Sequence, residues 1–146
     1  MFTSLDFFAG SGLVRLGLEP EFQTLWANDI CSKKAAVYNA NFDKDTDRKT
    51  FHLDSIENVN GADLPAADLA WASFPCQDLS LAGNLTGMRK GTRSGLFWQW
   101  IRVLDEMHEE EKRPPILVAE NVVGFVVANN GRHFNSAYNA LRERGY

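Results

Sequence analysis

Apolar positions along this chain occur either in short runs or at helical spacing, and the two patterns alternate. Runs rich in β-branched and aromatic residues predict strands at residues 2–8, 21–28, 50–53, 68–74 and 116–119. Apolar residues three and four positions apart predict helices at residues 13–18, 32–41, 95–107 and 132–144. This alternation is typical of an α/β protein with a mostly parallel sheet and helices on both faces.

Composition and charge narrow the class of protein. With 146 residues, of which 45% are hydrophobic, the chain is expected to form one domain around a single core. Its formal net charge of −4 disfavours a protein that coats nucleic acid by charge alone, so such contacts would have to be local. No stretch is apolar enough to span a membrane, and residues 1–5 lead into a strand instead of a signal peptide. We therefore expect a soluble cytoplasmic protein without membrane contact.

Cysteine and histidine positions give no sign of a metal site. Cys31 and Cys76 are too few for a disulfide framework and lack the paired spacing of zinc ligands. His52 and His133 add no ligand pattern. We expect free thiols in a reducing compartment and no bound metal.

A glycine-containing turn, Phe8-Ala9-Gly10-Ser11-Gly12, joins the first predicted strand to the first predicted helix. Gly10 and Gly12 allow the backbone to turn tightly and to bring amide groups close to a ligand at the start of a helix. A dinucleotide-binding fingerprint requires a third glycine three positions after Gly12, where this chain has Arg15. The turn thus predicts a ligand site but disfavours an NAD-dependent oxidoreductase.

Carboxylates follow the second and third predicted strands. Asp29 lies 17 positions after Gly12, near the spacing at which an acid accepts hydrogen bonds from ribose hydroxyls. It could equally serve as a cap for the helix that follows, and the sequence leaves both interpretations open. Asp54 ends the third strand, and the charged residues 43–49 between helix and strand are expected to form a solvated loop.

Cys76 directly follows the fourth predicted strand. Ligands of open α/β sheets bind at the carboxyl ends of the strands, so a thiol at this place is a candidate for chemistry. Pro75 fixes its own φ and stiffens the approach to the cysteine. The alternative is a small buried apolar residue, as most free cysteines are. Glu120 occupies the corresponding position after the fifth strand.

Residues 78–95 form a long segment with four glycines, at positions 83, 87, 91 and 95. Structureless segments of this length are usually functional lids or binding loops. Arg89, Lys90 and Arg93 lie within it without an intervening acid, which makes the cluster a candidate phosphate contact on an otherwise acidic protein.

Taken in order, these motifs resemble the S-adenosylmethionine-dependent cytosine-C5 methyltransferases, mainly those that act on DNA. The resemblance covers nearly the whole chain and rests on Phe8-Ala9-Gly10-Ser11-Gly12, Asp29, Asp54, Phe74-Pro75-Cys76-Gln77, Arg93 with Leu96-Phe97, and Glu120-Asn121-Val122. Pro-Cys-Gln after the fourth strand followed by Glu-Asn-Val after the fifth is specific in combination. Leu13 departs from the pattern, because it replaces the second glycine of a Gly-Gly pair common in that family.

The resemblance implies a Rossmann-like methyltransferase fold, truncated after about five strands, and the cofactor S-adenosylmethionine. The cofactor-binding residues that it implies are Phe8, Ala9, Gly10, Gly12, Asp29, Ile30, Asp54 and Pro75. Among them, the turn residues would shape the pocket for the methionine part of the cofactor. Asp29 would hold the ribose hydroxyls and Asp54 the adenine amino group.

The resemblance also implies a DNA (cytosine-5) methyltransferase mechanism, with Cys76, Glu120 and Arg93 at the catalytic site. A Cys76 thiolate adding to C6 makes C5 of cytosine enamine-like, so that C5 can attack a sulfonium methyl group. Glu120 would interact with ring N3 and the exocyclic amine. The residues expected to contact nucleic acid are Gln77, Ser80, Arg89, Lys90 and Arg93. A base in double-stranded DNA must be flipped out to reach such a site.

Members of this family continue well past the length of this chain. We therefore expect residues 1–146 to be the amino-terminal, cofactor-binding part of a bacterial or phage-type restriction–modification methyltransferase, without the target-recognition region and inactive alone. The fifth strand should then be an exposed sheet edge through which the chain self-associates. A tRNA cytosine-C5 methyltransferase and a non-catalytic cofactor-binding or interaction module remain as alternatives.

Overall fold

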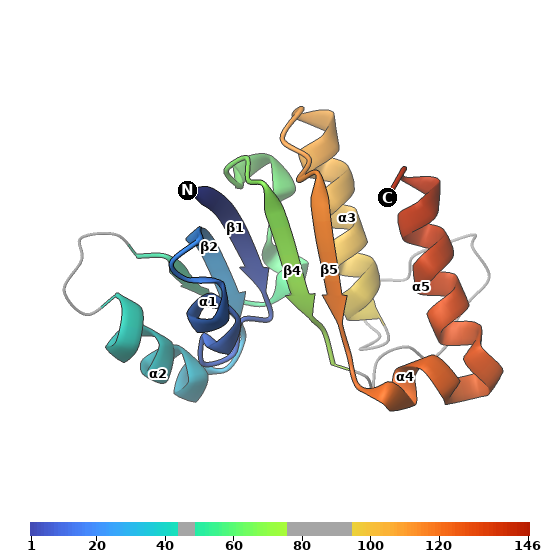
Figure 1. Ribbon diagram of the computed structural model, residues 1–146, viewed down its shortest axis with the longest axis horizontal. Coiled ribbons are helices and arrows are strands. Elements are labelled where there is room, and N and C mark those ends of the chain that lie inside the picture. Colours follow the sequence, from blue (N-terminus) through green and yellow to red (C-terminus); the bar gives the residue numbers. More distant parts are fainter. Residues whose placement is uncertain (44–48, 76–94) are drawn as a thin grey trace.

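One parallel sheet organises the computed structural model, which describes residues 1–43, 49–75 and 95–146. Its strands are β1 (Phe2–Phe7), β2 (Phe22–Asp29), β3 (Phe51–Leu53), β4 (Leu69–Ser73) and β5 (Ile116–Glu120). They are hydrogen-bonded in the order β3-β2-β1-β4-β5, with β1 at the centre (Figure 1). All neighbouring pairs are parallel, which confirms the predicted sheet.

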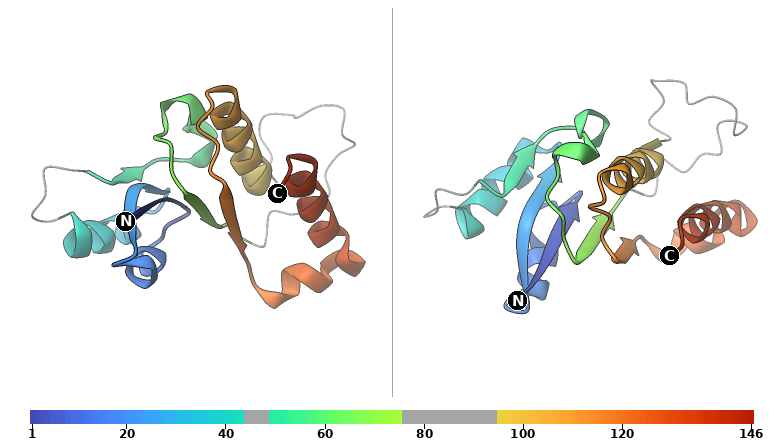
Figure 2. Two further views of the ribbon diagram at one scale, coloured as in Figure 1. Left: turned by 45° about the horizontal axis from the view of Figure 1, so that its top comes forward. Right: turned by 90° about the horizontal axis from the view of Figure 1, so that it is seen from above.

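Helices cover both faces of the sheet, also as predicted. In the view of Figure 1, α1 (Leu13–Leu18) and α2 (Ser32–Phe42) lie in front of the sheet, and α3 (Leu96–Glu109) lies behind it. Figure 2 shows α4 (Val123–Val127) and α5 (Arg132–Glu143) at the β5 end of the sheet. The short 3₁₀ helices are η1 (Ile56–Asn58), η2 (Gly61–Asp63) and η5 (Ala128–Gly131). The sequence pattern did not predict α4, since valine is a poor helix former.

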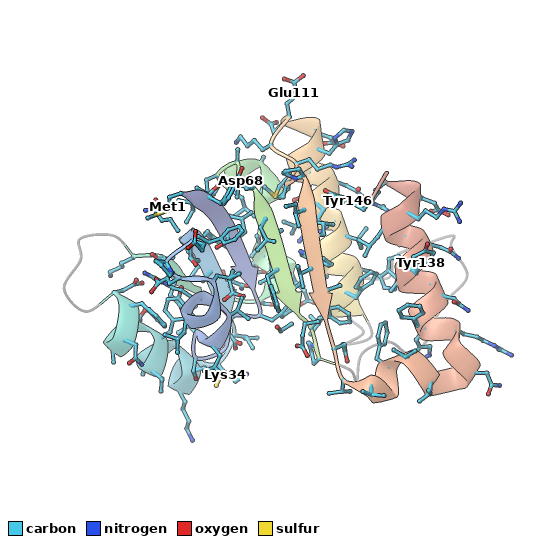
Figure 3. All side chains as sticks on the ribbon, in the orientation of Figure 1. Met1, Lys34, Asp68, Glu111, Tyr138 and Tyr146 are labelled. Atoms are coloured by element: carbon cyan, nitrogen blue, oxygen red, sulfur yellow. The ribbon has the colours of Figure 1, made fainter. Side chains whose placement is uncertain are left out.

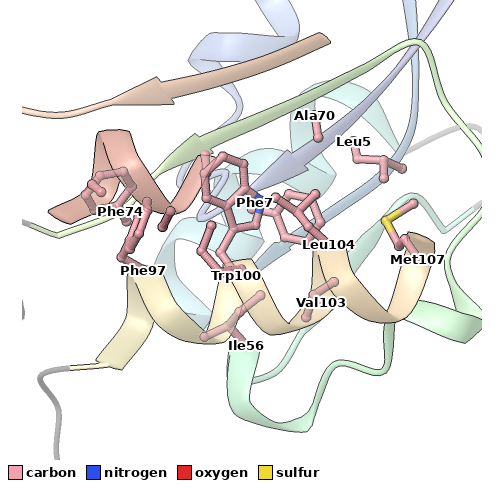
Figure 4. Packing of buried hydrophobic residues seen from close by; sticks show 14 of the residues in the cluster. Leu5, Phe7, Ile56, Ala70, Phe74, Phe97, Trp100, Val103, Leu104 and Met107 are labelled. Carbon is pink, nitrogen blue, oxygen red and sulfur yellow. The ribbon is translucent and has the colours of Figure 1, made fainter. Parts of the chain in front are cut away.

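The larger apolar core fills the space between the sheet and α3. Leu5 and Phe7 alternate along β1 with polar residues and point toward α3 (Figure 4). The Phe7 ring lies 4.9 Å from that of Trp26 and 6.3 Å from that of Trp100, measured between ring centroids. Trp100 is fully buried. These contacts fix the central strand, and with it the position of the turn that follows it.

A polar network fastens η1 and η2 to α3. Arg102 donates hydrogen bonds to the carbonyl oxygens of Ile56 and Val59, at 3.0 and 2.9 Å, and to Glu106 Oε1 at 2.6 Å. The other carboxylate oxygen of Glu106 accepts a hydrogen bond from the Gly61 amide at 2.7 Å. The segment between β3 and β4 is therefore tied to the helix on the far side of the core.

The expectation of a solvated loop after α2 is wrong for Asp43. Its side chain is only 6% exposed and lies 3.3 Å from Arg15 Nη1. Its second carboxylate oxygen accepts hydrogen bonds from the amides of Thr50 and Phe51, at 3.0 and 3.3 Å. A carboxylate can be buried when charged and N–H partners replace its hydration, and here those partners come from α1 and β3. Residues 44–48 lie outside the described residues.

The last strand, β5, and the last helix, α5, pack against the rest of the described fold on one side only. Arg144, the C-cap residue of α5, makes a bidentate pair with Asp105 of α3, at 2.6 and 2.7 Å. β5 pairs with β4 and has no second neighbouring strand in the described part of the chain. Within residues 1–43, 49–75 and 95–146, no helix is long and apolar enough to cross a membrane.

Candidate functional site

The carboxyl ends of the five parallel strands meet at one edge of the sheet, the lower edge in Figure 1. The sequence-predicted residues at these ends are the 8–12 turn after β1, Asp29 with Ile30 at β2, Asp54 after β3, Pro75 after β4, and Glu120 at β5. This edge is where ligands of doubly wound sheets bind. The structure thus brings together the described members of the predicted site along one border.

The turn after β1 is built from unusual backbone conformations. Phe8 has a φ of 60°, which is rare for a residue with a side chain, and Gly10 and Gly12 have φ values of 58° and 89°. A Cβ on Gly12 would overlap the Phe42 ring and lie 2.9 Å from Tyr38 Cδ2. Glycine at position 12 therefore serves both the left-handed turn and the close packing of α2 against it. Non-glycine residues in such conformations cluster at ligand sites.

Asp29 holds this turn in place. One of its carboxylate oxygens accepts a hydrogen bond from the Gly10 amide at 3.0 Å, and the other accepts one from the Cys31 amide at 2.9 Å. The Asp29 side chain is 8% exposed, and the Lys34 ammonium lies 3.6 Å from it at the same edge (Figure 3). The N-cap of α2 is Cys31, so Asp29 is not the cap that the sequence allowed as an alternative. Its hydrogen bonds couple the turn after β1 to the end of β2.

Asp54 borders a hollow beside β3. One carboxylate oxygen accepts hydrogen bonds from the Ser55 amide and from Asn58 Nδ2, both at 2.7 Å. The residue lines a cavity of about 480 Å³ together with Trp26 and His52, whose rings are stacked at 5.7 Å. Trp26 is 6% exposed and belongs to the larger apolar core.

The ends of β4 and β5 are tied together at the predicted catalytic position. Glu120 is the partner of Ser73 in the strand register. Asn121 donates a hydrogen bond from Nδ2 to the Phe74 carbonyl oxygen at 2.7 Å. Phe74 is buried against the rings of Phe97 and Phe125, so this end of β4 is anchored in the core. Pro75 follows Phe74 directly. The exposed residue Glu120 therefore lies on the neighbouring strand, close to the place where β4 leads into Pro75.

Comparison with known proteins agrees with this arrangement. The family model for C-5 cytosine-specific DNA methylases matches residues 2–146. The chain belongs to this family.

Individual members of the C-5 cytosine-specific DNA methylase family are similar over almost all of this chain. The Type II methyltransferase M.Bsp6I of Bacillus sp. (strain RFL6) is 33% identical over 141 residues, which are 95% of this chain and 42% of that protein. The Type II methyltransferase M.HhaI of Haemophilus parahaemolyticus is 30% identical over 143 residues, 97% of this chain and 40% of that protein. The chain therefore spans about two fifths of the length of these relatives.

Solved structures confirm the methyltransferase fold of this family member. The crystal structure of S. pombe Dnmt2 methyltransferase superposes with a TM-score of 0.74 and 20% sequence identity, covering 98% of this chain and 42% of that one. The structure of the Spodoptera frugiperda DNMT2 mutant superposes with a TM-score of 0.64 at 21% identity, covering 98% of this chain and 41% of that one. The shared fold includes the sheet edge described above.

Several residues expected to act in a cytosine-C5 methylase fall outside the described part of the chain. They are Cys76, Gln77, Ser80, Arg89, Lys90 and Arg93, together with most of the predicted lid at residues 78–95. Their roles stay predictions. Among the described residues, no three histidine, cysteine or acidic side chains are grouped as a metal site would require.

Sequence reasoning missed Asp6 in this methylase-family chain. It is 1% exposed near the carboxyl end of β1, and neither carboxyl oxygen has a hydrogen-bond partner among the described residues. Burial, and then repulsion from the Asp29 carboxylate, raise the pKa of Asp6 to about 7. The sequence did contain a sign of this, because Asp6 lies inside an apolar strand pattern. Burying a carboxylate costs free energy unless the group is kept neutral or has a partner.

We expect Asp6 to make this family member less stable as pH rises from about 4 to 7. The folded protein retains the proton, with a pKa near 7, whereas the unfolded chain loses it near the ordinary value of 3.8. Stability therefore falls with a slope of up to about 1.4 kcal/mol per pH unit in this window and levels off above it. Urea unfolding of wild type and Asp6→Asn at pH 5 and pH 8 measures the effect. The variant should gain considerably more stability relative to wild type at pH 8 than at pH 5, where only a small part of the loss has occurred, and an equal difference at both pH values contradicts the prediction.

Proposed function

We propose that residues 1–146 form the cofactor-binding part of a cytosine-C5 DNA methyltransferase, which transfers a methyl group from S-adenosylmethionine to C5 of cytosine. The observation that carries this proposal is the coupling of Asp29 to the Gly10 amide at the carboxyl edge of the sheet. The matching family model and the Type II methyltransferase relatives support it. Recognition of the DNA sequence is assigned to other parts of the complete enzyme, because the chain spans only about two fifths of its relatives' length.

The residues at the edge fit this cofactor. Each Asp29 oxygen accepts one N–H and, having a second lone pair, can accept a ribose hydroxyl as well. Ile30 is 72% exposed and offers an apolar surface for a purine ring next to Asp29. The second carboxylate oxygen of Asp54 has no hydrogen-bond donor among the described residues and can accept a hydrogen bond from an amino group. The bound cofactor supplies an electrophilic methyl group.

The catalytic chemistry is assigned to the ends of β4 and β5. The Cys76 thiolate adds to C6 of the target cytosine, and the electron pair released onto the ring is stabilised by a proton that Glu120 holds at N3. The bound cofactor would supply the methyl group that C5 accepts, and the Cys76 thiolate would leave by elimination once the C5 proton passes to a solvent base. The tie between Asn121 and the Phe74 carbonyl supports this assignment, because it keeps Glu120 beside the residue that precedes Pro75.

Double-stranded DNA is the proposed partner of the complete enzyme. Gln77, Ser80, Arg89, Lys90 and Arg93 are proposed to contact the nucleic acid, with Arg93 also supporting the catalytic site. A cluster of basic side chains on a chain of net charge −4 would place phosphate contacts at one location. The target cytosine must leave the duplex to reach Cys76.

Three measurements test the proposal. Calorimetric titration of the chain with S-adenosylmethionine should give saturable binding with one site per chain. The absence of heat at millimolar cofactor would favour a non-catalytic interaction module. In the complete enzyme, Cys76→Ser should abolish methyl transfer to DNA and leave cofactor binding intact. Parallel assays with DNA and tRNA identify the substrate, and preferential methylation of tRNA would contradict the assignment to DNA.

We further infer that this chain self-associates through the β5 end of the sheet. Ile116 at the start of the edge strand is 51% exposed, and Val122, Val123 and Val127, which follow the other end of this strand, are 60%, 82% and 68% exposed. An unpaired strand edge next to apolar side chains is a template for pairing with another chain.

Sedimentation velocity over a range of protein concentrations checks this inference. We expect wild type to form dimers or larger species as concentration rises, and Ile116→Lys combined with Val123→Glu to remain monomeric. Val37→Lys is the matched control, because Val37 is an exposed valine on α2, away from this edge, at 47% exposure. A wild-type chain that stays monomeric at all concentrations would exclude self-association through this edge.

A further inference from the structure

Asp6 is a buried acid near the carboxyl end of the central strand. In the strand register, Asp6 of β1 is paired with Ala27 of β2 and with Trp71 of β4, and neither neighbour is charged. Strand β1 ends one residue later, at Phe7. Neither carboxyl oxygen has a hydrogen-bond partner in the part of the chain that is described. Buried polar groups are nearly always partnered, so an unpartnered carboxyl directly behind a ligand-binding turn indicates a function.

Groups from three elements surround this acid, and none neutralises it. At the end of β2, Asp29 adds negative charge. On α2, Tyr38 interacts with Asp6 electrostatically, and Lys34 lies against Asp29 at 3.6 Å. On α1, Arg15 donates hydrogen bonds to the Tyr38 hydroxyl at 3.2 Å and to the carboxylates of Glu19 and Asp43 at 3.0 and 3.3 Å. The cations of this region therefore have other partners among the described residues, and Asp6 favours its neutral, protonated form.

Binding of a positive charge in front of the turn would reverse this preference. A nearby cation stabilises a carboxylate relative to the acid. S-adenosylmethionine carries a sulfonium, whereas its demethylated product, S-adenosylhomocysteine, has a neutral thioether at the same place and is otherwise alike. The two ligands therefore differ in one positive charge on sulfur, and that charge can shift the protonation of Asp6.

We propose that Asp6 is a positioning residue for the sulfonium-bearing cofactor, neutral in the ligand-free protein and deprotonated when the positive charge is bound in front of the 8–12 turn. The carboxylic acid loses its proton to the solvent, and the carboxylate left behind offsets the sulfonium charge. This inference rests on the proposed function, since it takes the cofactor from there. It predicts that the protein binds the methyl donor more tightly than the product at high pH and discriminates less at low pH.

Isothermal titration calorimetry of the 146-residue chain at pH 6, in two buffers of different ionisation enthalpy, counts the protons released. We expect S-adenosylmethionine to release close to one proton more than S-adenosylhomocysteine. Groups common to both ligands cancel in this difference. With a pKa of about 7 for Asp6, the affinity for the sulfonium ligand relative to the thioether should rise about tenfold from pH 6 to pH 8.

Two variants complete the experiment. Asp6→Asn, which keeps the shape of the side chain, should abolish both the extra proton and the pH-dependent discrimination. Asp68→Asn is the matched control and should change neither. Asp68 is an acid at the opposite end of the sheet from Lys34 (Figure 3), hydrogen-bonded to the Thr3 amide and hydroxyl at 2.7 and 2.8 Å. Thermal unfolding at pH 5 verifies that both variants are folded.

The outcomes separate this inference from the proposed function. Equal proton release by the two ligands, or an undiminished difference in Asp6→Asn, overturns the role of Asp6 while the observed binding still supports the proposed function. If wild type binds neither ligand at millimolar concentration, the proposed function fails and the role of Asp6 fails with it.

Discussion

Replacing Asp29 with alanine is expected to weaken binding of S-adenosylmethionine about a hundredfold or more. The Asp29 carboxylate holds the Gly10 and Cys31 amides at 3.0 and 2.9 Å. Hydrogen bonds to a charged group contribute about 1.5–3 kcal/mol each, so losing both costs roughly 3 kcal/mol or more of turn ordering, before any lost contact with the ribose. Calorimetric titration of wild type and variant measures the ratio of dissociation constants.

Two further variants of this experiment separate binding from folding. Asp29→Asn keeps the side-chain volume but replaces one acceptor oxygen with a donor that faces an amide, so it should also bind poorly while remaining folded by circular dichroism. Glu57→Gln is the matched control, because Glu57 is an exposed acid in η1, away from the turn. An Asp29→Asn variant that is folded and binds the cofactor like wild type would show that this carboxylate does not organise the site.

The largest expected loss of stability comes from Gly61→Ala. Gly61 is buried where η2 crosses α3, and a Cβ there would overlap the Val103 carbonyl oxygen and lie 2.8 Å from Glu106 Cβ. Backbone atoms of a packed helix cannot move aside without breaking their own hydrogen bonds. Overpacking of this kind destabilises proteins by about 1–3 kcal/mol. We expect the upper end of this range, because in the variant the displaced backbone would also strain the hydrogen bond from the Gly61 amide to Glu106. Urea unfolding measures the change.

Gly17→Ala is the control for that substitution. Gly17 lies in α1, and a Cβ there would meet no atom within 4 Å. Alanine is a better helix former than glycine by up to about 1 kcal/mol, so this variant should be neutral or slightly more stable. If Gly61→Ala is as stable as Gly17→Ala, then the contact between η2 and α3 does not have the close packing described above.

The strands and the main helices could be predicted because their signals are local. Apolar runs and helical spacing gave β1, β2, β3, β4 and β5 within about two residues at their ends. The predicted site residues at strand ends follow from the same signal, since parallel strands place their carboxyl ends at one edge. Local patterns were insufficient for α4, whose valines favour strands when considered alone.

The surroundings of single charged residues could not be predicted in this way. Asp43 lies in a run of charged residues that reads as solvated, yet it is buried because Arg15 and the start of β3 reach it from distant parts of the chain. The cap interpretation of Asp29 was also plausible locally, but the N-cap of α2 is Cys31, and Asp29 accepts a hydrogen bond from the Gly10 amide, 19 positions away. Such contacts depend on how elements pack, which no window of sequence contains.

By itself, the sequence determined the order of strands and helices, the glycine turn, and the motif residues that identify the cytosine-C5 methylase family. Only the tertiary structure decided that Asp6 is a buried acid without a partner, and that Asn121 ties Glu120 to the end of β4. The physical reason is that backbone preference and apolar spacing act between near neighbours, whereas the charge state of a side chain depends on solvent exclusion and on groups from other strands. The chemistry of this chain therefore depends on contacts that form only when the sheet is assembled.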